Sequence, residues 1–174
     1  LMMNTETFNE LLSMYLEDGN EGEVFKKFEE MFKLGVEPNS TTYEILMKIF
    51  FNRRDFAAAE PLFQSLLDSP QPMESTPFLY MMRLRLLSGN AAGVRECHEE
   101  MKRRKFRLTV LSYRLLRRAC ETATDRSVAE RLLREVIGLK LFGELPLNER
   151  GEDFDEGEGN ITVDGIPLHR DKSP

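Results

Sequence analysis

The side chains of this sequence that could carry chemistry are few. The two histidines, His98 and His169, have no cysteine or carboxylate at the spacing of a metal site. The two cysteines, Cys97 and Cys120, form no Cys-x-x-Cys pattern, and we interpret them as small buried residues in a reducing compartment. The sequence also shows no phosphate-binding glycine loop and no Ser/His/Asp set. We therefore predict that the chain is not an enzyme and holds neither a cofactor nor a metal ion.

A second kind of candidate is a set of cations at a regular interval. Lys48, Arg83 and Arg118 follow one another at intervals of 35 residues, and Ser13 lies one interval before Lys48. If they share one face of stacked units, they form a basic stripe that neutralises phosphate groups in a salt-sensitive way. The structural alternative is that Lys48 pairs with Glu44, four residues earlier, and that the arginines form only a solvated face. The sequence leaves both interpretations open.

The elements that would position these cations repeat at the same interval. Apolar residues recur in four columns of four copies each: Phe8, Tyr43, Phe78 and Tyr113; Leu11, Leu46, Met81 and Leu116; Val24, Ala59, Val94 and Ala129; Met31, Leu66, Met101 and Val136. The columns predict four helix-turn-helix units, at about 5–39, 40–74, 75–109 and 110–144. Because one such unit cannot bury its own core, we expect an all-α fold, a solenoid of stacked units.

The best-defined turn lies between the two units that come first. Gly35 suits the left-handed position just past a helix end, and Pro38 follows because it cannot continue that helix. Asn39 can then cap the next helix with its side-chain oxygen. Within the first unit Gly19 suits the turn between the two helices, but the second unit has Arg54 at that point.

Residues 5–39 resemble a pentatricopeptide repeat of the plain 35-residue kind. The motifs that carry the resemblance are Phe8-Asn9, Gly19, Phe28 to Met31, and Gly35 to Asn39. Later units keep fewer motifs, among them Thr42-Tyr43, Ser88-Gly89-Asn90, Glu99-Glu100-Met101 and Ser112-Tyr113. Tetratricopeptide repeats are a weaker match, because their 34-residue period and tryptophan pattern are absent. By this resemblance the chain is identified as a short, divergent pentatricopeptide repeat protein of about four repeats.

The resemblance implies that the first helices of the units line a concave surface, which binds single-stranded RNA at one base per repeat. In this family the fifth and the last residue of a repeat read the base. Carried over, the pairs are Asn9 with Asn39, Glu44 with Glu74, Leu79 with Thr109, and Arg114 with Glu144. The first pair resembles pyrimidine readers, and its amide groups can donate and accept hydrogen bonds in the plane of a base. The resemblance also implies a location in mitochondria or chloroplasts.

Charge is distributed in three blocks. Residues 1–74 carry 6 Lys/Arg and 14 Asp/Glu, residues 75–140 carry 15 and 7, and residues 141–174 carry 3 and 9. The basic block includes the cluster from Lys102 to Arg107, for which stabilisation of a helix C-terminus is the structural alternative to phosphate binding. Residues 145–174 are acidic and rich in Gly, and we predict an extended tail that docks on a basic surface of this chain or of a partner.

Two hypotheses of function follow. In the first, the chain is an organellar RNA-binding adaptor that supports RNA splicing, processing, stability or translation. In the second, it is a protein-binding solenoid subunit of a large organellar complex, such as a ribosome or the transcription machinery. No run of 18 apolar residues predicts a membrane span, and uncapped solenoid ends favour self-association. The chain begins Leu-Met-Met in mid-pattern, so we expect a trimmed fragment whose targeting peptide is not visible.

Overall fold

The computed structural model describes residues 3–124, 126–141, 162–163 and 166–167. Eight helices lie in these residues: α1 (Thr5–Glu17), α2 (Glu21–Lys33), α3 (Ser40–Arg53), α4 (Phe56–Asp68), α5 (Thr76–Leu87), α6 (Ala91–Arg103), α7 (Val110–Thr122) and α8 (Arg126–Leu141). Two short strands, β1 (Thr162–Val163) and β2 (Ile166–Pro167), pair antiparallel. The rest of the predicted acidic tail lies outside the described residues. None of the described helices is long and apolar enough to cross a membrane.

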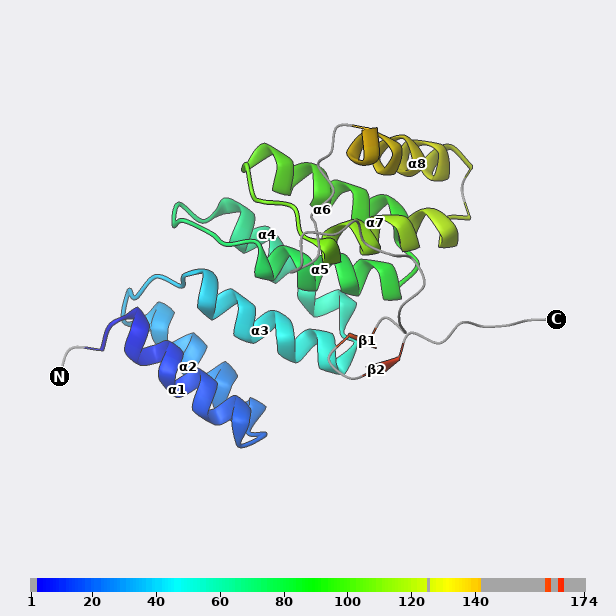
Figure 1. The fold of residues 1–174 in the computed structure, drawn as a ribbon. Helices are drawn as coiled ribbons and strands as arrows, with labels where there is room; N and C mark the ends of the chain where they lie inside the picture. Colours follow the sequence, from blue (N-terminus) through cyan, green and yellow to red (C-terminus); the bar gives the residue numbers. More distant parts are fainter. Residues whose placement is uncertain (1–2, 125, 142–161, 164–165, 168–174) are drawn as a thin grey trace, which may run out of the picture.

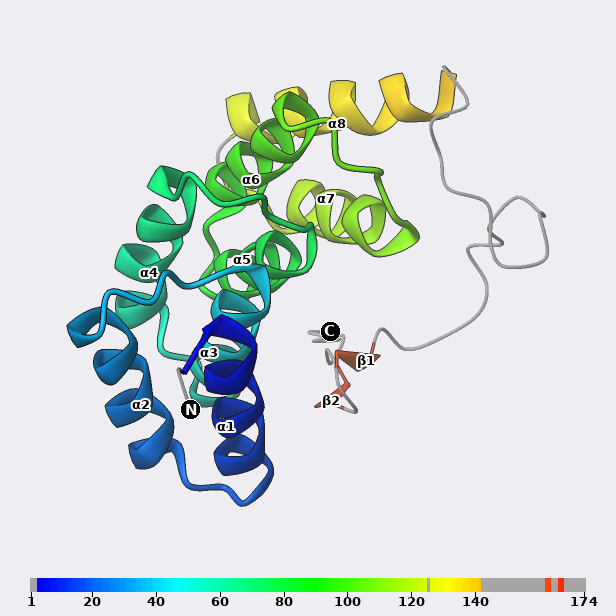
Figure 2. The same cartoon turned by 90° about the vertical axis from the view of Figure 1, so that its left-hand side faces the viewer.

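The helices form antiparallel pairs that stack into one curved array, which confirms the predicted all-α solenoid (Figure 1). The first helix of each pair packs on the first helix of the next, in the order α1, α3, α5, α7. Figure 2 shows these four as an inner row, with α2, α4, α6 and α8 as the outer row along the left and top. The concave side of the array is therefore the side of the first helices.

Polar side chains fix where most of the helices begin. An oxygen of the residue before the helix accepts a hydrogen bond from a backbone N–H of the first turn at Asn4, Asn20, Asn39, Asp55, Asn90 and Thr109. At Asn39 and Thr109 the bond is reciprocal, because the hydroxyl of Thr42 or Ser112 accepts from the backbone N–H of the capping residue. The cap predicted at Asn39 is thus confirmed.

Five of the helices end in the same turn, with a left-handed residue directly after the last helical positions. In three of them that residue is glycine: Gly19 (φ +70°), Gly35 (φ +69°) and Gly89 (φ +75°). The prediction for Gly35 is therefore confirmed. In the other two turns the residue is a cation, Arg54 (φ +53°) or Lys105 (φ +58°). The side chain at Arg54 thus replaces the expected glycine without changing the conformation of the turn.

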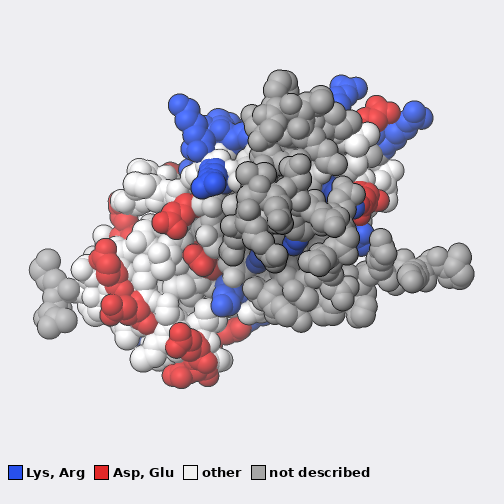
Figure 3. Space-filling model, in the orientation of Figure 1, with Lys and Arg blue, Asp and Glu red and all other residues white. Residues whose placement is uncertain are grey.

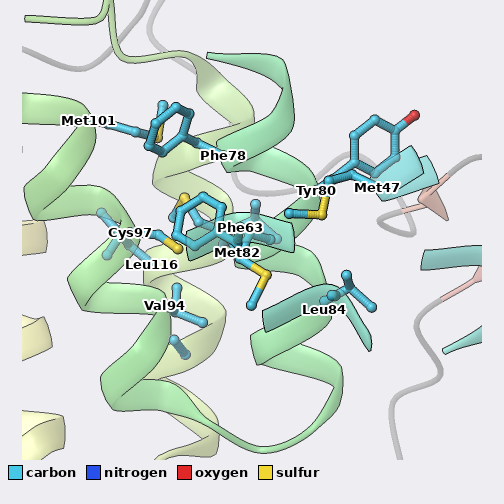
Figure 4. Close-up of a cluster of buried hydrophobic side chains, with 14 of the residues drawn as sticks. Met47, Phe63, Phe78, Tyr80, Met82, Leu84, Val94, Cys97, Met101 and Leu116 are labelled. Carbon is cyan, nitrogen blue, oxygen red and sulfur yellow. The ribbon is translucent and has the colours of Figure 1, made fainter. Parts of the chain in front are cut away.

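The core has two parts that meet at α3. Ile45, Leu46 and Ile49 pack toward α1 and α2, whereas Met47 and Phe51 belong to the larger cluster formed with α4 to α8. Figure 4 shows the larger cluster, in which the ring of Phe63 meets Phe78 edge to face at 5.3 Å between centroids. Aromatic pairs of this geometry stabilise beyond the area that they bury. Apolar residues dominate both parts of the core.

Two residues singled out for possible chemistry lie in this interior. His98 and Cys97 are both fully buried on α6, and Cys120 on α7 is half-buried. Burial raises the pKa of the Cys97 thiol to about 12, although the guanidinium of Arg85 favours the thiolate. Among the described residues no group of three or more His, Cys, Asp or Glu side chains could hold a metal ion.

Candidate nucleic-acid interface

The structure brings Asn9 and Asn39 into direct contact. Asn9 lies on α1 and Asn39 immediately precedes α3, and Asn9 Nδ2 donates a hydrogen bond of 2.9 Å to Asn39 Oδ1. The side chain of Asn9 is largely buried, and Asn39 is half-buried. The two residues predicted to read one base thus lie side by side on the inner row of helices.

Hydrogen bonds to Thr42 determine what this pair can offer to a ligand. Thr42 Oγ1 donates to Asn9 Oδ1 at 2.6 Å, and the backbone N–H of Thr42 donates to Asn39 Oδ1 at 3.2 Å. Both amide oxygens therefore accept hydrogen bonds from this protein. Each amide oxygen has two acceptor sites and each amide nitrogen has two hydrogens. The capacity that remains toward a ligand is therefore mostly N–H donors, with one acceptor site left on Asn9 Oδ1.

The second pair, Glu44 and Glu74, occupies the same register one unit later but offers only carboxylates. The backbone N–H of Glu74 donates to Ser40 Oγ at 2.9 Å, which fixes Glu74 beside the first turn of α3. Burial raises the pKa of Glu44, and the negative charge of Glu74 raises it further, whereas Lys48 opposes both effects. The pair therefore disfavours an approaching phosphate.

The remaining residues predicted to face a base have different surroundings. Leu79 is half-buried on α5 and packs against the larger core cluster. Thr109 Oγ1 accepts a hydrogen bond of 3.3 Å from the backbone N–H of Ser112, so its hydroxyl caps α7. Arg114 lies half-buried on α7, and its predicted partner Glu144 lies outside the described residues. Because Leu79 has an apolar side chain, the pair Leu79 and Thr109 does not repeat the hydrogen bond between Asn9 and Asn39.

The cations of the column lie on three successive first helices, α3, α5 and α7. Lys48 is exposed. The guanidinium of Arg83 lies over the ring of Tyr80 at 5.2 Å and within 5.9 Å of the ring of Phe51. Arg118 NH1 lies 3.2 Å from a carboxylate oxygen of Glu121, one turn further along α7. The packing order thus brings the column onto the inner row, with part of its charge offset by Glu121.

Other cations of the basic block are used inside the protein, and the sequence did not indicate this. Arg85 NH2 lies 2.9 Å from Glu60 Oε2, and Arg85 NH1 donates to the carbonyl oxygen of Gly93 at 2.8 Å. Arg104 NH2 donates to the carbonyl oxygen of Leu67 at 3.0 Å, and its guanidinium lies over the ring of Phe78. A signal was present for Arg85, because an arginine on a helix with an otherwise apolar surface must find partners when it is buried.

The face of the molecule seen in Figure 3 is divided by charge. In Figure 3, Lys and Arg atoms gather along the upper edge, over the end of α6 and over α8, and Asp and Glu atoms lie at the lower left over α1 and α2. This agrees with the acidic and basic blocks of the sequence. A polyanion would therefore meet its strongest attraction on the second half of the array.

An array of paired helices, stacked with its first helices on the concave side, defines a helical-repeat solenoid. Residues 3–52 match the PPR repeat family. The fold is similar to the crystal structure of the pentatricopeptide repeat protein PPR10 from maize, with a TM-score of 0.64 at 19% identity. The match covers 83% of this chain and 20% of that chain, so this chain spans about a fifth of the length of PPR10. No curated protein matches the chain. The family match thus covers residues 3–52, and the likeness to PPR10 extends the same fold over 83% of the chain.

Proposed function

We propose that this protein is an RNA-binding adaptor of the pentatricopeptide type, which holds single-stranded RNA along the inner row of helices. The observation that carries the proposal is the hydrogen bond between Asn9 and Asn39, the two residues that we propose to read one base. Proteins of this family are generally adaptors without catalytic activity. In this proposal the adaptor acts in mitochondria or chloroplasts, in splicing, processing, stability or translation of transcripts.

The chemistry of the first repeat supports a preference for pyrimidines. Asn39 Oδ1 already accepts two hydrogen bonds and Asn9 Oδ1 accepts one, so the remaining capacity of the two amide groups is mostly to donate hydrogen bonds. Cytosine offers two adjacent acceptors, O2 and N3, and uracil offers O2 and O4. A donor pair on the protein therefore fits the edge of a pyrimidine, and it fits cytosine best because the N3–H of uracil would meet another donor.

The cation column supports contact with the backbone of the same strand. Lys48, Arg83 and Arg118 lie on neighbouring helices of the inner row, and each would neutralise a phosphate beside a bound base. Binding by this column alone is tolerant of sequence, so the first repeat would add a preference to an otherwise general affinity.

The test is fluorescence anisotropy with short single-stranded RNAs that are cytosine-rich, uracil-rich or adenine-rich, each over a salt series. We expect the cytosine-rich RNA to bind tightest, and an Arg118→Gln variant to bind about fivefold more weakly at 0.1 M salt, as loss of one phosphate contact predicts. An Arg117→Gln variant is the matched control, because Arg117 is also paired with Glu121 but is not in the column. Equal losses in both variants would contradict a specific role for the column.

A second candidate is a protein-binding solenoid subunit of a larger organellar complex. The observation in its favour is the pair Glu44 and Glu74, which places like charges where the first repeat has amides. The absence of RNA binding by the wild-type protein at low salt, in the experiment above, would favour this candidate. Its acidic first half and the predicted acidic tail would then be the surfaces that dock on a protein partner.

A further inference from the structure

The five left-handed turns in the part of the chain that the structure describes are built alike, so they can be compared position by position. In each, the residue after the left-handed one donates its backbone N–H to a carbonyl oxygen of the last helical turn. The bonds are Asn20 to Tyr15, Val36 to Met31, Asp55 to Phe50, Asn90 to Arg85, and Phe106 to Met101. Such turns favour glycine because it has no Cβ to oppose a positive φ. Arg54 and Lys105 are thus the two left-handed positions in the described residues at which stability alone favours another residue.

The conformation of Lys105 is enforced by its neighbours. Lys105 N donates to the carbonyl oxygen of Lys102 at 2.9 Å, and Phe106 N donates to that of Met101 at 3.0 Å. The ring of Phe106 meets the buried ring of Phe78 at 5.1 Å. The turn is therefore anchored in the core, and a lysine at its left-handed position cannot relax without moving Phe106.

The surroundings of Lys105 are strongly basic and mostly turned to solvent. Lys102, Lys105 and Arg107 are exposed, and the side chain of Arg103 is 74% exposed although it pairs with Glu100. Arg104 is the exception, because it points inward to Leu67 and Phe78. The helix dipole explains cations in the last turn of α6, but Lys105 and Arg107 lie beyond Arg103, where α6 ends.

The connection that carries these cations leads directly to the inner row. It runs from Arg104 to Thr109, which caps α7 and is one of the residues predicted to face a base. In Figure 3 the Lys and Arg atoms over the end of α6 lie at the upper left edge of the molecule. A strand on the inner row that passes Thr109 would therefore have this basic connection at its side.

We propose that Lys105 and Arg107, with Lys102 beside them, form a second RNA-phosphate contact at the edge of the array, separate from the column of Lys48, Arg83 and Arg118. The inference rests on the proposed RNA-binding function and adds a place where the strand leaves the inner row. The lysine at a glycine position is retained because its charge contributes to binding, and the protein is less stable for it.

The experiment compares Lys105→Gly and Lys105→Gln with Arg54→Gly in anisotropy and in thermal unfolding. Arg54→Gly is the matched control, because it relieves the same backbone strain and removes one cation, but in the connection between α3 and α4. We expect both Lys105 variants to lose about fivefold in affinity for single-stranded RNA at 0.1 M salt, with a shallower salt slope. We expect both glycine variants to raise the unfolding midpoint by about 3 °C, and Lys105→Gln to leave it unchanged.

The RNA affinity of Arg118→Gln, measured in the same series, separates the inner-row column from the edge contact. If Arg118→Gln weakens binding and the Lys105 variants do not, the edge contact is wrong and the inner-row proposal stands. The reverse result supports the edge contact and contradicts the column. Equal losses in Arg54→Gly and Lys105→Gly would show an effect of net charge alone and would overturn the inference, and a wild-type protein that binds no RNA would overturn both proposals.

Discussion

Arg85 on α5 and Glu60 on α4 form a two-bonded ion pair, with Arg85 Nε 3.0 Å from Glu60 Oε1 and Arg85 NH2 2.9 Å from Glu60 Oε2. The guanidinium also lies over the ring of Phe63 at 5.4 Å, and the arginine side chain is only 12% exposed. One residue thus connects the second and third helix pairs through a planar group that a lysine cannot imitate.

Replacing Arg85 by Lys should therefore destabilise the protein by about 1–3 kcal/mol, because the fork geometry and the contact with Phe63 are lost while Glu60 remains. Urea unfolding followed by circular dichroism measures the change. Arg117→Lys serves as the control, since Arg117 pairs with Glu121 on the surface of one helix and the change should cost less than about 0.5 kcal/mol. Similar costs for the two variants would show that burial of Arg85 has no energetic consequence.

Asn39 has two tasks, and two substitutions separate them. Asn39→Ala should lower the free energy of unfolding by about 1–2 kcal/mol, because α3 loses its cap and Asn9 loses its acceptor. Asn39→Asp keeps the accepting oxygen and should be close to neutral in stability. It removes the N–H donors, however, so in RNA titrations its preference for cytosine over adenine should disappear. A retained preference would exclude Asn39 from base contact.

Alanine substitutions at two glycines should change stability in opposite directions, because the two backbone conformations differ. Gly89→Ala should destabilise by about 1 kcal/mol, because φ is +75° there. Gly22→Ala should instead stabilise slightly, by up to about 0.5 kcal/mol, since Gly22 is exposed in α2 and an added Cβ meets only Asn20 Oδ1 at an ordinary 3.8 Å. Thermal unfolding of both variants measures the difference, and the same sign for both would contradict the described turn.

The two cysteines should differ in reactivity. Because burial raises the pKa of Cys97 to about 12, a thiol reagent at pH 8 should modify Cys120 in the folded protein and reach Cys97 only after unfolding. Mass spectrometry of the modified protein distinguishes the two sites, and a Cys120→Ser variant should show no fast modification. Rapid labelling of Cys97 in that variant would contradict its burial.

The raised pKa of Cys97 also has a consequence for stability at high pH. The folded state holds the thiol proton more tightly than the unfolded state, so its contribution to stability is complete below about pH 8.5 and falls as the pH rises toward 12. A Cys97→Ala variant should lack this alkaline loss. The comparison is made by urea unfolding at pH 8 and pH 10, and parallel losses in both proteins would assign the effect to other groups.

Glu44 should oppose both folding and RNA binding when it is ionised. Its pKa is raised in the folded state by burial and by Glu74, so the stability that its protonated form contributes is present at acidic pH and is lost as the pH rises through the folded-state pKa. Glu44→Gln should therefore raise the unfolding midpoint at pH 7 but not at pH 4, and should tighten RNA binding at pH 7. Weaker binding by Glu44→Gln would instead indicate that the carboxylate contacts RNA.

The sequence predicts the architecture well because each prediction rests on local chemistry that repeats. The apolar columns place Phe8, Tyr43, Phe78 and Tyr113 in the core, where all four are buried. Gly35 and Asn39 act as their backbone and hydrogen-bonding preferences require. The 35-residue interval therefore predicts the helices and their buried faces correctly, since equivalent residues of neighbouring repeats share the same environment.

The candidate site is less accessible to such reasoning, because it depends on which side chains meet between units. The family resemblance implied only that Asn9 and Asn39 read one base together. Their direct hydrogen bond and the part of Thr42 in orienting both amides were not predicted. Charge counting also treated Arg85 and Arg104 as surface cations, whereas both are bound within the array. Burial and pairing of charged groups follow from tertiary contacts that a linear pattern does not contain.

Helix α3 contributes to both parts of the core, and this has a consequence for local unfolding. The pair α1–α2 contacts α3 through Ile45, Leu46 and Ile49, and the ring of Phe25 also stacks on Phe50. It can therefore detach as a cooperative unit while Met47 and Phe51 keep the other side in place. Amide hydrogens of the first repeat should then exchange with solvent before those of α5.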